Sequence, residues 1–124
     1  MKLTLRLVAL LQGVYFFVPG IWPLLHMPSF LAVTGPKTDL WLVKTVGALL
    51  AVIGLALMAA GIKKRVTPEI MLLGVLAAVA MAVVDIYYSG TNTISDIYRY
   101  DAACEIIIIF LWVIAWNKSK NKGK

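Results

Sequence analysis

Cysteine, histidine and recognisable catalytic motifs are scarce in this sequence, and each scarcity excludes a class of site. One cysteine, Cys104, and one histidine, His26, occur among 124 residues. A single cysteine excludes an intrachain disulfide and a CxxC redox pair, and a single histidine excludes paired-histidine haem ligation. The sequence also contains no nucleophile–base motif, Walker loop, glycine-rich dinucleotide fingerprint or HExxH. We therefore predict no cofactor and no metal site, and no catalytic residue can be assigned.

Charged residues are equally scarce. They make up 15% of the chain, against 61% hydrophobic residues, and the mean hydropathy is +0.88. Soluble domains carry about 25% charged residues, so we expect this chain to lie in a lipid bilayer. Each crossing needs about 20 mostly apolar residues, so four crossings with short loops use nearly the whole length. The net charge is +6, but the basic residues flank apolar segments. We therefore predict no nucleic-acid partner.

Turn signals divide the chain into four apolar segments. Thr67, Pro68 and Glu69 are typical of a helix start, because threonine caps the helix, proline suits its first position and a carboxylate interacts favourably with its dipole. The fold class predicted is all-α, an integral membrane four-helix bundle in a single domain. Its helices are expected at about residues 3–25, 40–62, 68–88 and 96–116.

The segments outside these helices have distinct compositions. Residues 26–38 mix proline and glycine with Phe30 and Leu31, which is typical of an interfacial loop that caps the bundle. Residues 117–124 are predicted to form a disordered basic cytoplasmic tail. Lys2 and Arg6 before an apolar run also fit a signal peptide, but an A-x-A-like cleavage site is lacking, so an uncleaved helix is expected.

Basic residues are distributed unevenly between the two ends of the predicted bundle. Three of the twelve lie toward the proposed outer side: Lys37, Lys44 and Arg99. Because Lys and Arg concentrate in short cytoplasmic loops, we predict an N-in/C-in, multi-pass protein of a cell membrane. The residues assigned to the cytoplasmic side are Lys2, Arg6, Lys63, Lys64, Arg65, Lys118, Lys120, Lys122 and Lys124.

Small residues gather on one face of two predicted helices. In the second, glycine recurs every seven residues, and in the third a helical face carries small residues up to Asp85. Such faces pack helices closely in lipid, or less often expose backbone to a ligand. Gln12 is expected to hydrogen-bond to a neighbouring helix. The small residues are Gly47, Gly54 and Gly61 in the second helix, and Gly74, Ala78 and Ala82 in the third.

Charged residues inside the spans indicate a functional cluster. An ionised group near mid-membrane costs at least about 2.5 kcal/mol and usually turns inward. Lys44 could neutralise one acid and fix helix register, or Asp101 and Glu105 could line an outward-opening pocket, with Glu105 the candidate to hold a proton or a cation. Nearby tyrosines either anchor the interface or hold an amine beside a carboxylate. The candidate ligand-binding residues are Lys44, Asp85, Tyr88, Tyr98, Asp101 and Glu105.

Three features of the first half of the chain are shared with a known group of proteins: Arg6 and Gly13 in the first span, and the run GALLAVIGLAL, residues 47–57, in the second. In these features the chain resembles the DoxX-like group of small four-helix bacterial membrane proteins. It implies a bacterial inner membrane and a partner-dependent role beside redox enzymes. The stretch YRYDAACE, residues 98–105, does not match that group.

Three functions are consistent with these patterns. The first is an accessory or structural membrane subunit that has a membrane-protein partner or forms a homo-oligomer. The second is a binder, or a small enzyme, that acts on a lipophilic or amine-containing small molecule through Asp85, Asp101 and Glu105. The third is an oligomeric cation-coupled transporter. Small multidrug transporters place an essential glutamate in their first helix, and this first span contains no acid.

Overall fold

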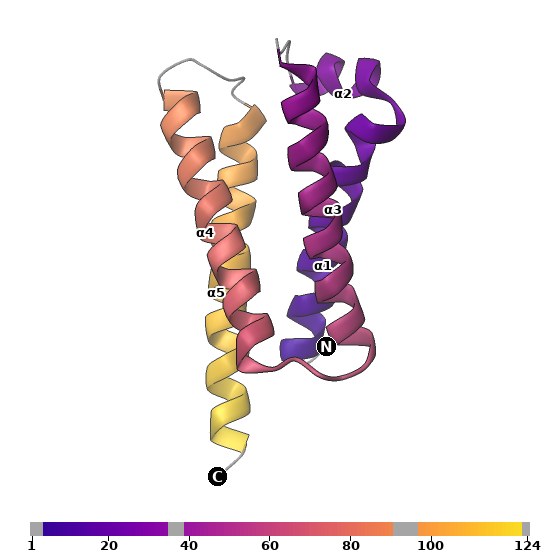
Figure 1. Cartoon of the computed structure of the whole chain (residues 1–124). Coiled ribbons are helices and arrows are strands. Elements are labelled where there is room, and N and C mark those ends of the chain that lie inside the picture. The colour runs from indigo at the N-terminus through magenta and orange to yellow at the C-terminus, as the bar shows by residue number, and fades with distance from the viewer. Residues whose placement is uncertain (1–3, 35–38, 91–96, 123–124) are drawn as a thin grey trace.

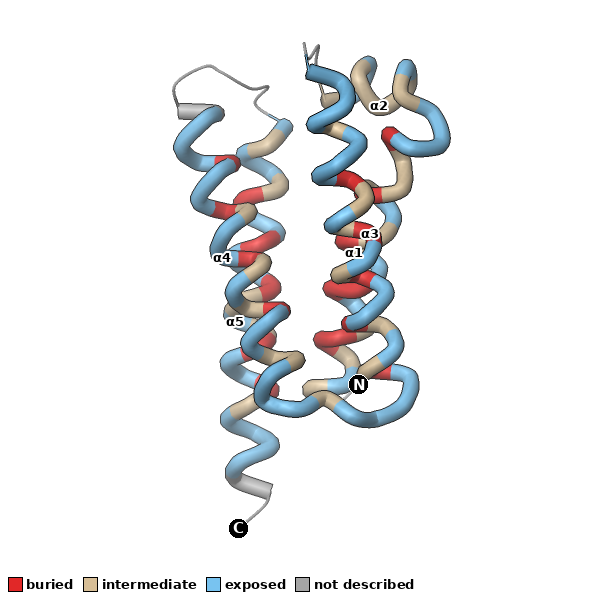
Figure 2. The backbone as a smooth tube through the Cα atoms, in the orientation of Figure 1, coloured by how far each residue is buried: buried red, intermediate tan, exposed pale blue. Residues whose placement is uncertain are grey.

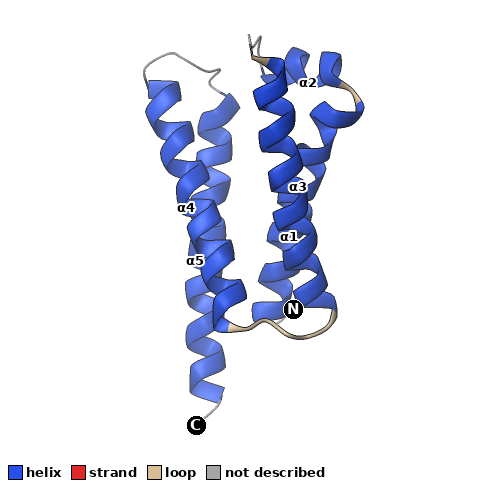
Figure 3. Cartoon of the chain, viewed as in Figure 1, coloured by secondary structure: helices blue, strands red, loops and turns tan. Residues whose placement is uncertain are grey.

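A computed structural model describes residues 4–34, 39–90 and 97–122. In this part of the chain every element is a helix (Figure 3), which confirms the all-α prediction. Three helices, α1, α3 and α4, are long and apolar enough to cross a membrane, as far as the described residues reach. The elements are α1 (Leu5–Leu25), α2 (Met27–Thr34), α3 (Leu40–Ile62), α4 (Pro68–Gly90) and α5 (Ile97–Lys122).

The long helices form two antiparallel hairpins (Figure 1). α1 packs along α3, and α4 packs along α5, while α1 also contacts α2, α4 and α5 and so joins the hairpins. The short helix α2 lies at the end opposite the two termini. Buried residues follow the inward side of each long helix, and most other positions are exposed (Figure 2). This distribution is typical of helices whose outer faces contact lipid instead of water.

Glycines on both helices bring α1 and α3 into close contact, and we call this contact the α1–α3 seam. A Cβ added at Gly13 would lie 2.8 Å from the carbonyl oxygen of Gly54, and one added at Gly20 would lie 2.6 Å from that of Gly47. Glycine removes this obstacle, so the two backbones can touch along the seam. The predicted packing role of the α3 glycines is confirmed, whereas their glycine partners on α1 were not predicted.

Beyond these two glycine pairs, a charged side chain makes a third contact along the α1–α3 seam. The Nε of Arg6 donates a hydrogen bond of 2.7 Å to the carbonyl oxygen of Gly61, near the end of α3. Carbonyls in the last turn of a helix have no partner within the helix, so a basic side chain satisfies them well. This contact joins the first turn of α1 to the last turn of α3.

A buried polar contact joins the two hairpins. The amide Nε2 of Gln12 donates to the carbonyl oxygen of Gly74 at 2.8 Å, and the indole Nε1 of Trp112 donates to Gln12 Oε1 at 2.6 Å. Gln12 and Trp112 are fully buried. The prediction that Gln12 bonds to a neighbouring helix is confirmed, and the amide links α1 to both α4 and α5.

Helix ends show where the predictions hold and where they fail. Thr67 caps α4 as predicted, because its Oγ1 accepts a hydrogen bond of 3.2 Å from the backbone N–H of Ile70. The segment expected as a loop contains α2. The tail expected to be disordered is helical as far as Lys122. Lysine is a good helix former, and cations near a helix C-terminus interact favourably with its dipole, so α5 continues past Trp116.

Candidate functional site

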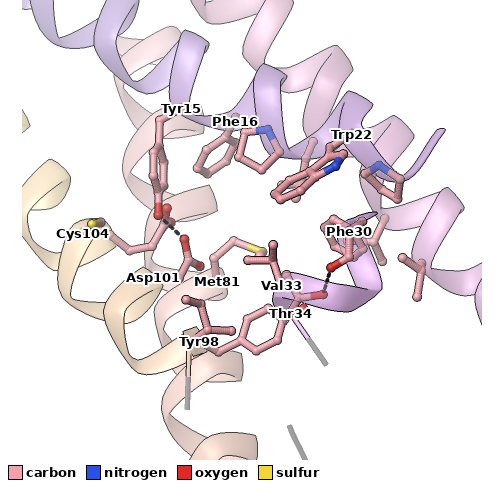
Figure 4. A pocket seen from close by; sticks show the side chains of 18 of the residues that line it. Tyr15, Phe16, Trp22, Phe30, Val33, Thr34, Met81, Tyr98, Asp101 and Cys104 are labelled. Carbon is pink, nitrogen blue, oxygen red and sulfur yellow. Dashed lines mark hydrogen bonds between the residues drawn. The ribbon is translucent and has the colours of Figure 1, made fainter. Parts of the chain in front are cut away.

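A cavity of about 530 Å³ lies between the hairpins, toward the end that α2 covers (Figure 4). Residues of all five helices line it, and most of them are apolar or aromatic. Cavities of this size and character are typical of small-molecule sites, where a few polar groups orient the ligand. The polar groups that line this cavity include Tyr15, Thr34, Tyr98, Asp101, Cys104 and Glu105.

Two of the predicted acids lie on the cavity wall. Asp101 and Glu105 are one helical turn apart on α5 and therefore share a face, as their spacing predicted. Asp101 is half-buried and accepts a hydrogen bond at Oδ1 from the hydroxyl of Tyr15 on α1 (Figure 4). Glu105 is 1% exposed, and its Oε2 has no hydrogen-bond partner among the described residues. A buried oxygen without a partner is costly, so a proton, a water molecule or a bound group is expected to satisfy it.

The third acid stands behind the other two. Asp85 on α4 is 1% exposed, and its Oδ2 likewise has no hydrogen-bond partner in the part of the chain that the structure describes. Its carboxyl lies close enough to Asp101 for a side-chain hydrogen bond and interacts electrostatically with Glu105. The three carboxyls therefore form one group, which we call the acid cluster. Asp85 does not line the cavity itself, and it interacts with the two acids that do, Asp101 and Glu105.

The other predicted site residues are distributed differently. Tyr98 lines the cavity. Tyr88 is 41% exposed, and its ring stacks edge-on against Tyr87 with centroids 5.0 Å apart. Lys44 is exposed on α3 and is not among the residues that line the cavity. The structure thus gathers the acids and Tyr98 and leaves Lys44 and Tyr88 outside the cavity.

Tyr15 and Cys104 were not among the predicted site residues. Tyr15 follows the inward-facing Gln12 by three residues, so helix periodicity could have placed both on one side of α1. Cys104 follows Asp101 by three residues, and it lies beside the Tyr15 hydroxyl.

The helix α2 covers the end of the cavity away from the two termini with Phe30, Val33 and Thr34. Ser29 fixes its position, because the hydroxyl accepts a hydrogen bond of 2.8 Å from the indole Nε1 of Trp22 and donates one of 3.1 Å to the carbonyl oxygen of His26. The Nδ1 of His26 accepts a hydrogen bond of 3.2 Å from the backbone N–H of Ser29, which caps the start of α2. The cap predicted for this region is therefore a helix.

The contact between Gln12, Gly74 and Trp112 lies further toward the termini than the acid cluster. Gln12 precedes Tyr15 by about one helical turn, and Trp112 follows Glu105 by about two. Because Gln12 and Trp112 are fully buried, the hairpins are closed together at this level. The cavity therefore has a lid, α2, at one end and a closed contact at the other.

Comparison of the chain with protein-family models, with curated proteins and with solved structures found no match. The resemblance to the DoxX-like group stays a prediction. No group of three or more His, Cys, Asp or Glu residues within the described ranges is placed to hold a metal ion.

Proposed function

We propose that the chain crosses a bacterial inner membrane four times, with both termini in the cytoplasm and the cavity toward the outer side. α1, α3 and α4 supply three candidate spans, and α5 packs beside α4. The acids of α5 at positions 101 and 105 turn toward the protein, whereas Ile107 and Phe110 are exposed. This arrangement suits a fourth span, because its charged groups avoid lipid and its apolar groups contact it.

We infer that the protein binds a lipophilic small molecule that carries a positive charge. The observation that carries this inference is Glu105, which is buried, lines an apolar cavity and presents an oxygen with no hydrogen-bond partner. A cationic group beside Glu105 and Asp101 would neutralise charge that the chain leaves uncompensated. The apolar body of the ligand would fill the rest of the cavity and exclude water from the ion pair.

Aromatic side chains support a cation over a neutral ligand. Tyr15, Trp22 and Tyr98 line the same cavity as the acids. The face of an aromatic ring attracts a cation, with a gain of about 0.5–2 kcal/mol that is largest where water is excluded. A cavity with carboxyls and aromatic rings suits an organic ammonium or phosphonium ion, whose charge is spread over apolar groups.

Binding of two ions of matched size tests this function. Tetraphenylphosphonium and tetraphenylborate have similar apolar surfaces and opposite charges, so bilayer partition and cavity fit can be separated from charge recognition. We expect the protein in phosphatidylcholine nanodiscs to quench or shift its tryptophan fluorescence on addition of the cation and to leave the anion unbound. Equal affinity for the two ions would rule out recognition by the carboxyls.

A pair of acid-to-amide variants localises the binding. Glu105→Gln removes the charge while keeping the shape, and we expect at least a roughly tenfold loss of affinity, which corresponds to about 1.4 kcal/mol. Glu69→Gln is the matched control, because Glu69 is exposed in the first turn of α4 and does not line the cavity. Unchanged affinity in Glu105→Gln would place the ligand elsewhere.

The roles of accessory subunit and of oligomeric cation-coupled transporter stay predictions. Co-purification of a second membrane protein would support the first of them, and cation flux in liposomes would support the second.

A further inference from the structure

The acid cluster contains more carboxyl groups than a single monovalent cation requires. Asp85, Asp101 and Glu105 are close enough to interact, and two of them bury an oxygen that has no partner, Asp85 Oδ2 and Glu105 Oε2. Three negative charges cannot be held together out of water without compensation. Two carboxyls share a hydrogen bond only when at least one of them holds a proton. The empty site therefore needs at least one proton.

The groups shown in contact with the cluster are neutral or acidic. α1 contributes Tyr15, whose hydroxyl donates to Asp101, and α5 contributes Cys104 beside that hydroxyl. α4 contributes the third acid, Asp85. Lys44 on α3 is exposed and does not line the cavity.

We propose that a proton and the cationic ligand are alternative occupants of the acid cluster, so that binding of the ligand releases a proton. This inference rests on the proposed binding function and adds the chemistry of exchange to it. In the empty site one carboxyl keeps its O–H bond and shares the proton with a neighbouring carboxyl. When the cation arrives, that O–H bond breaks, the proton leaves to water and the carboxylate pairs with the cation.

The exchange balances charge within the buried site. One positive charge enters and one leaves, so the desolvated cluster keeps the same net charge whether it is empty or occupied. No electron is transferred and no further reactant is needed. Asp85 has a specific part in the exchange, because it lies behind the cavity wall and can hold a shared proton without contacting the ligand.

Proton release can be counted directly with a ligand that does not itself titrate. Protein in phosphatidylcholine nanodiscs is mixed with tetraphenylphosphonium in weakly buffered solution that contains a pH indicator. We expect about one proton released per bound cation, and an affinity that rises by up to about tenfold for each unit of increasing pH in the range where the cluster exchanges protons. Glu69→Gln, which alters an exposed acid at the other end of α4, should give the same proton count.

The outcomes separate the exchange from the binding function. Binding with no proton released and with one affinity at all pH values would overturn the exchange and leave the binding site in place. No binding at any pH would overturn the proposed function itself. Asp85→Asn should lower the number of protons released per bound cation, and circular dichroism and gel filtration would show whether it folds. If Asp85→Asn does not fold, the number of protons released by the unaltered protein per bound cation decides whether the exchange occurs.

Discussion

Gly13 and Gly54 face each other so closely that a Cβ added to either one would lie within 3 Å of the other's carbonyl oxygen, at 2.8 Å and 2.5 Å. Gly54→Ala must therefore separate the backbones or distort one of them. We expect a loss of about 1–3 kcal/mol in the free energy of unfolding, which is the usual range for overpacking. Reversible unfolding in mixed micelles measures it, and Ala56→Val on the exposed side of α3 is the control.

Removing one member of the buried polar contact should leave its partner unsatisfied. Trp112→Phe deletes the N–H that donates to Gln12 Oε1, so we expect a loss of about 1–3 kcal/mol in unfolding free energy. Gln12→Leu in the same background should cost less than it does alone, because the two side chains already depend on each other. Strictly additive losses would show that the bond contributes nothing.

Ser29 is expected to control how fast the lid opens. Ser29→Ala removes the hydroxyl that joins Trp22 to His26, so α2 loses its hydrogen bond to α1. A loss of about 1 kcal/mol in lid closure corresponds to a roughly fivefold faster dissociation of tetraphenylphosphonium. Stopped-flow fluorescence measures the rate, and Ser29→Thr, which keeps a hydroxyl, should restore it.

Lys44 is expected to be tolerant of substitution. Its side chain is exposed and does not line the cavity, so Lys44→Met should change the unfolding free energy by less than about 0.5 kcal/mol. The affinity of the Lys44→Met variant for tetraphenylphosphonium should also equal that of the unaltered protein. A large loss of stability that a second change at Asp85, Asp101 or Glu105 recovers would restore the ion pair expected from the sequence.

Topology is testable with single cysteines in a Cys104→Ser background. A membrane-impermeant maleimide added to intact cells should label Ala32→Cys on α2 and should not label Lys64→Cys in the turn before α4. Both positions are exposed, so accessibility within the protein does not limit the reaction. Labelling of Lys64→Cys from outside would reverse the proposed orientation.

Helix periodicity explains which parts of the site could be predicted from sequence. Asp101 and Glu105 share a face of α5, and the face of Gly74, Ala78, Ala82 and Asp85 is buried on α4, because both patterns depend only on 100° per residue. The bounds of α1, α3 and α4 follow closely from the apolar runs and from the caps, whereas α5 continues to Lys122 instead of ending at Trp116. These features are local, so one sequence is sufficient to predict them.

The position of Lys44 depends on a contact between helices, which is why the prediction placed it differently. The sequence pattern predicted that Lys44 could neutralise one of the acids. Gly47 and Gly54 pack against α1, and Val43, Val46 and Leu50 line the cavity beside them. Lys44 is exposed and does not line the cavity. Periodicity gives the angle between two side chains on a helix, but only tertiary packing decides what each of them faces.

The contacts of the α1–α3 seam recur every seven residues on both helices, and they fix the register of α1 against α3. A step of seven residues up α1, from Arg6 to Gly13 to Gly20, matches a step of seven residues down α3, from Gly61 to Gly54 to Gly47. At 1.5 Å per residue the fixed stretch is about 21 Å long. Since neither helix can slide without placing larger side chains against backbone, the hairpin cannot lengthen or shorten to match a bilayer. In a thinner or thicker membrane it must tilt, or the surrounding lipids must deform.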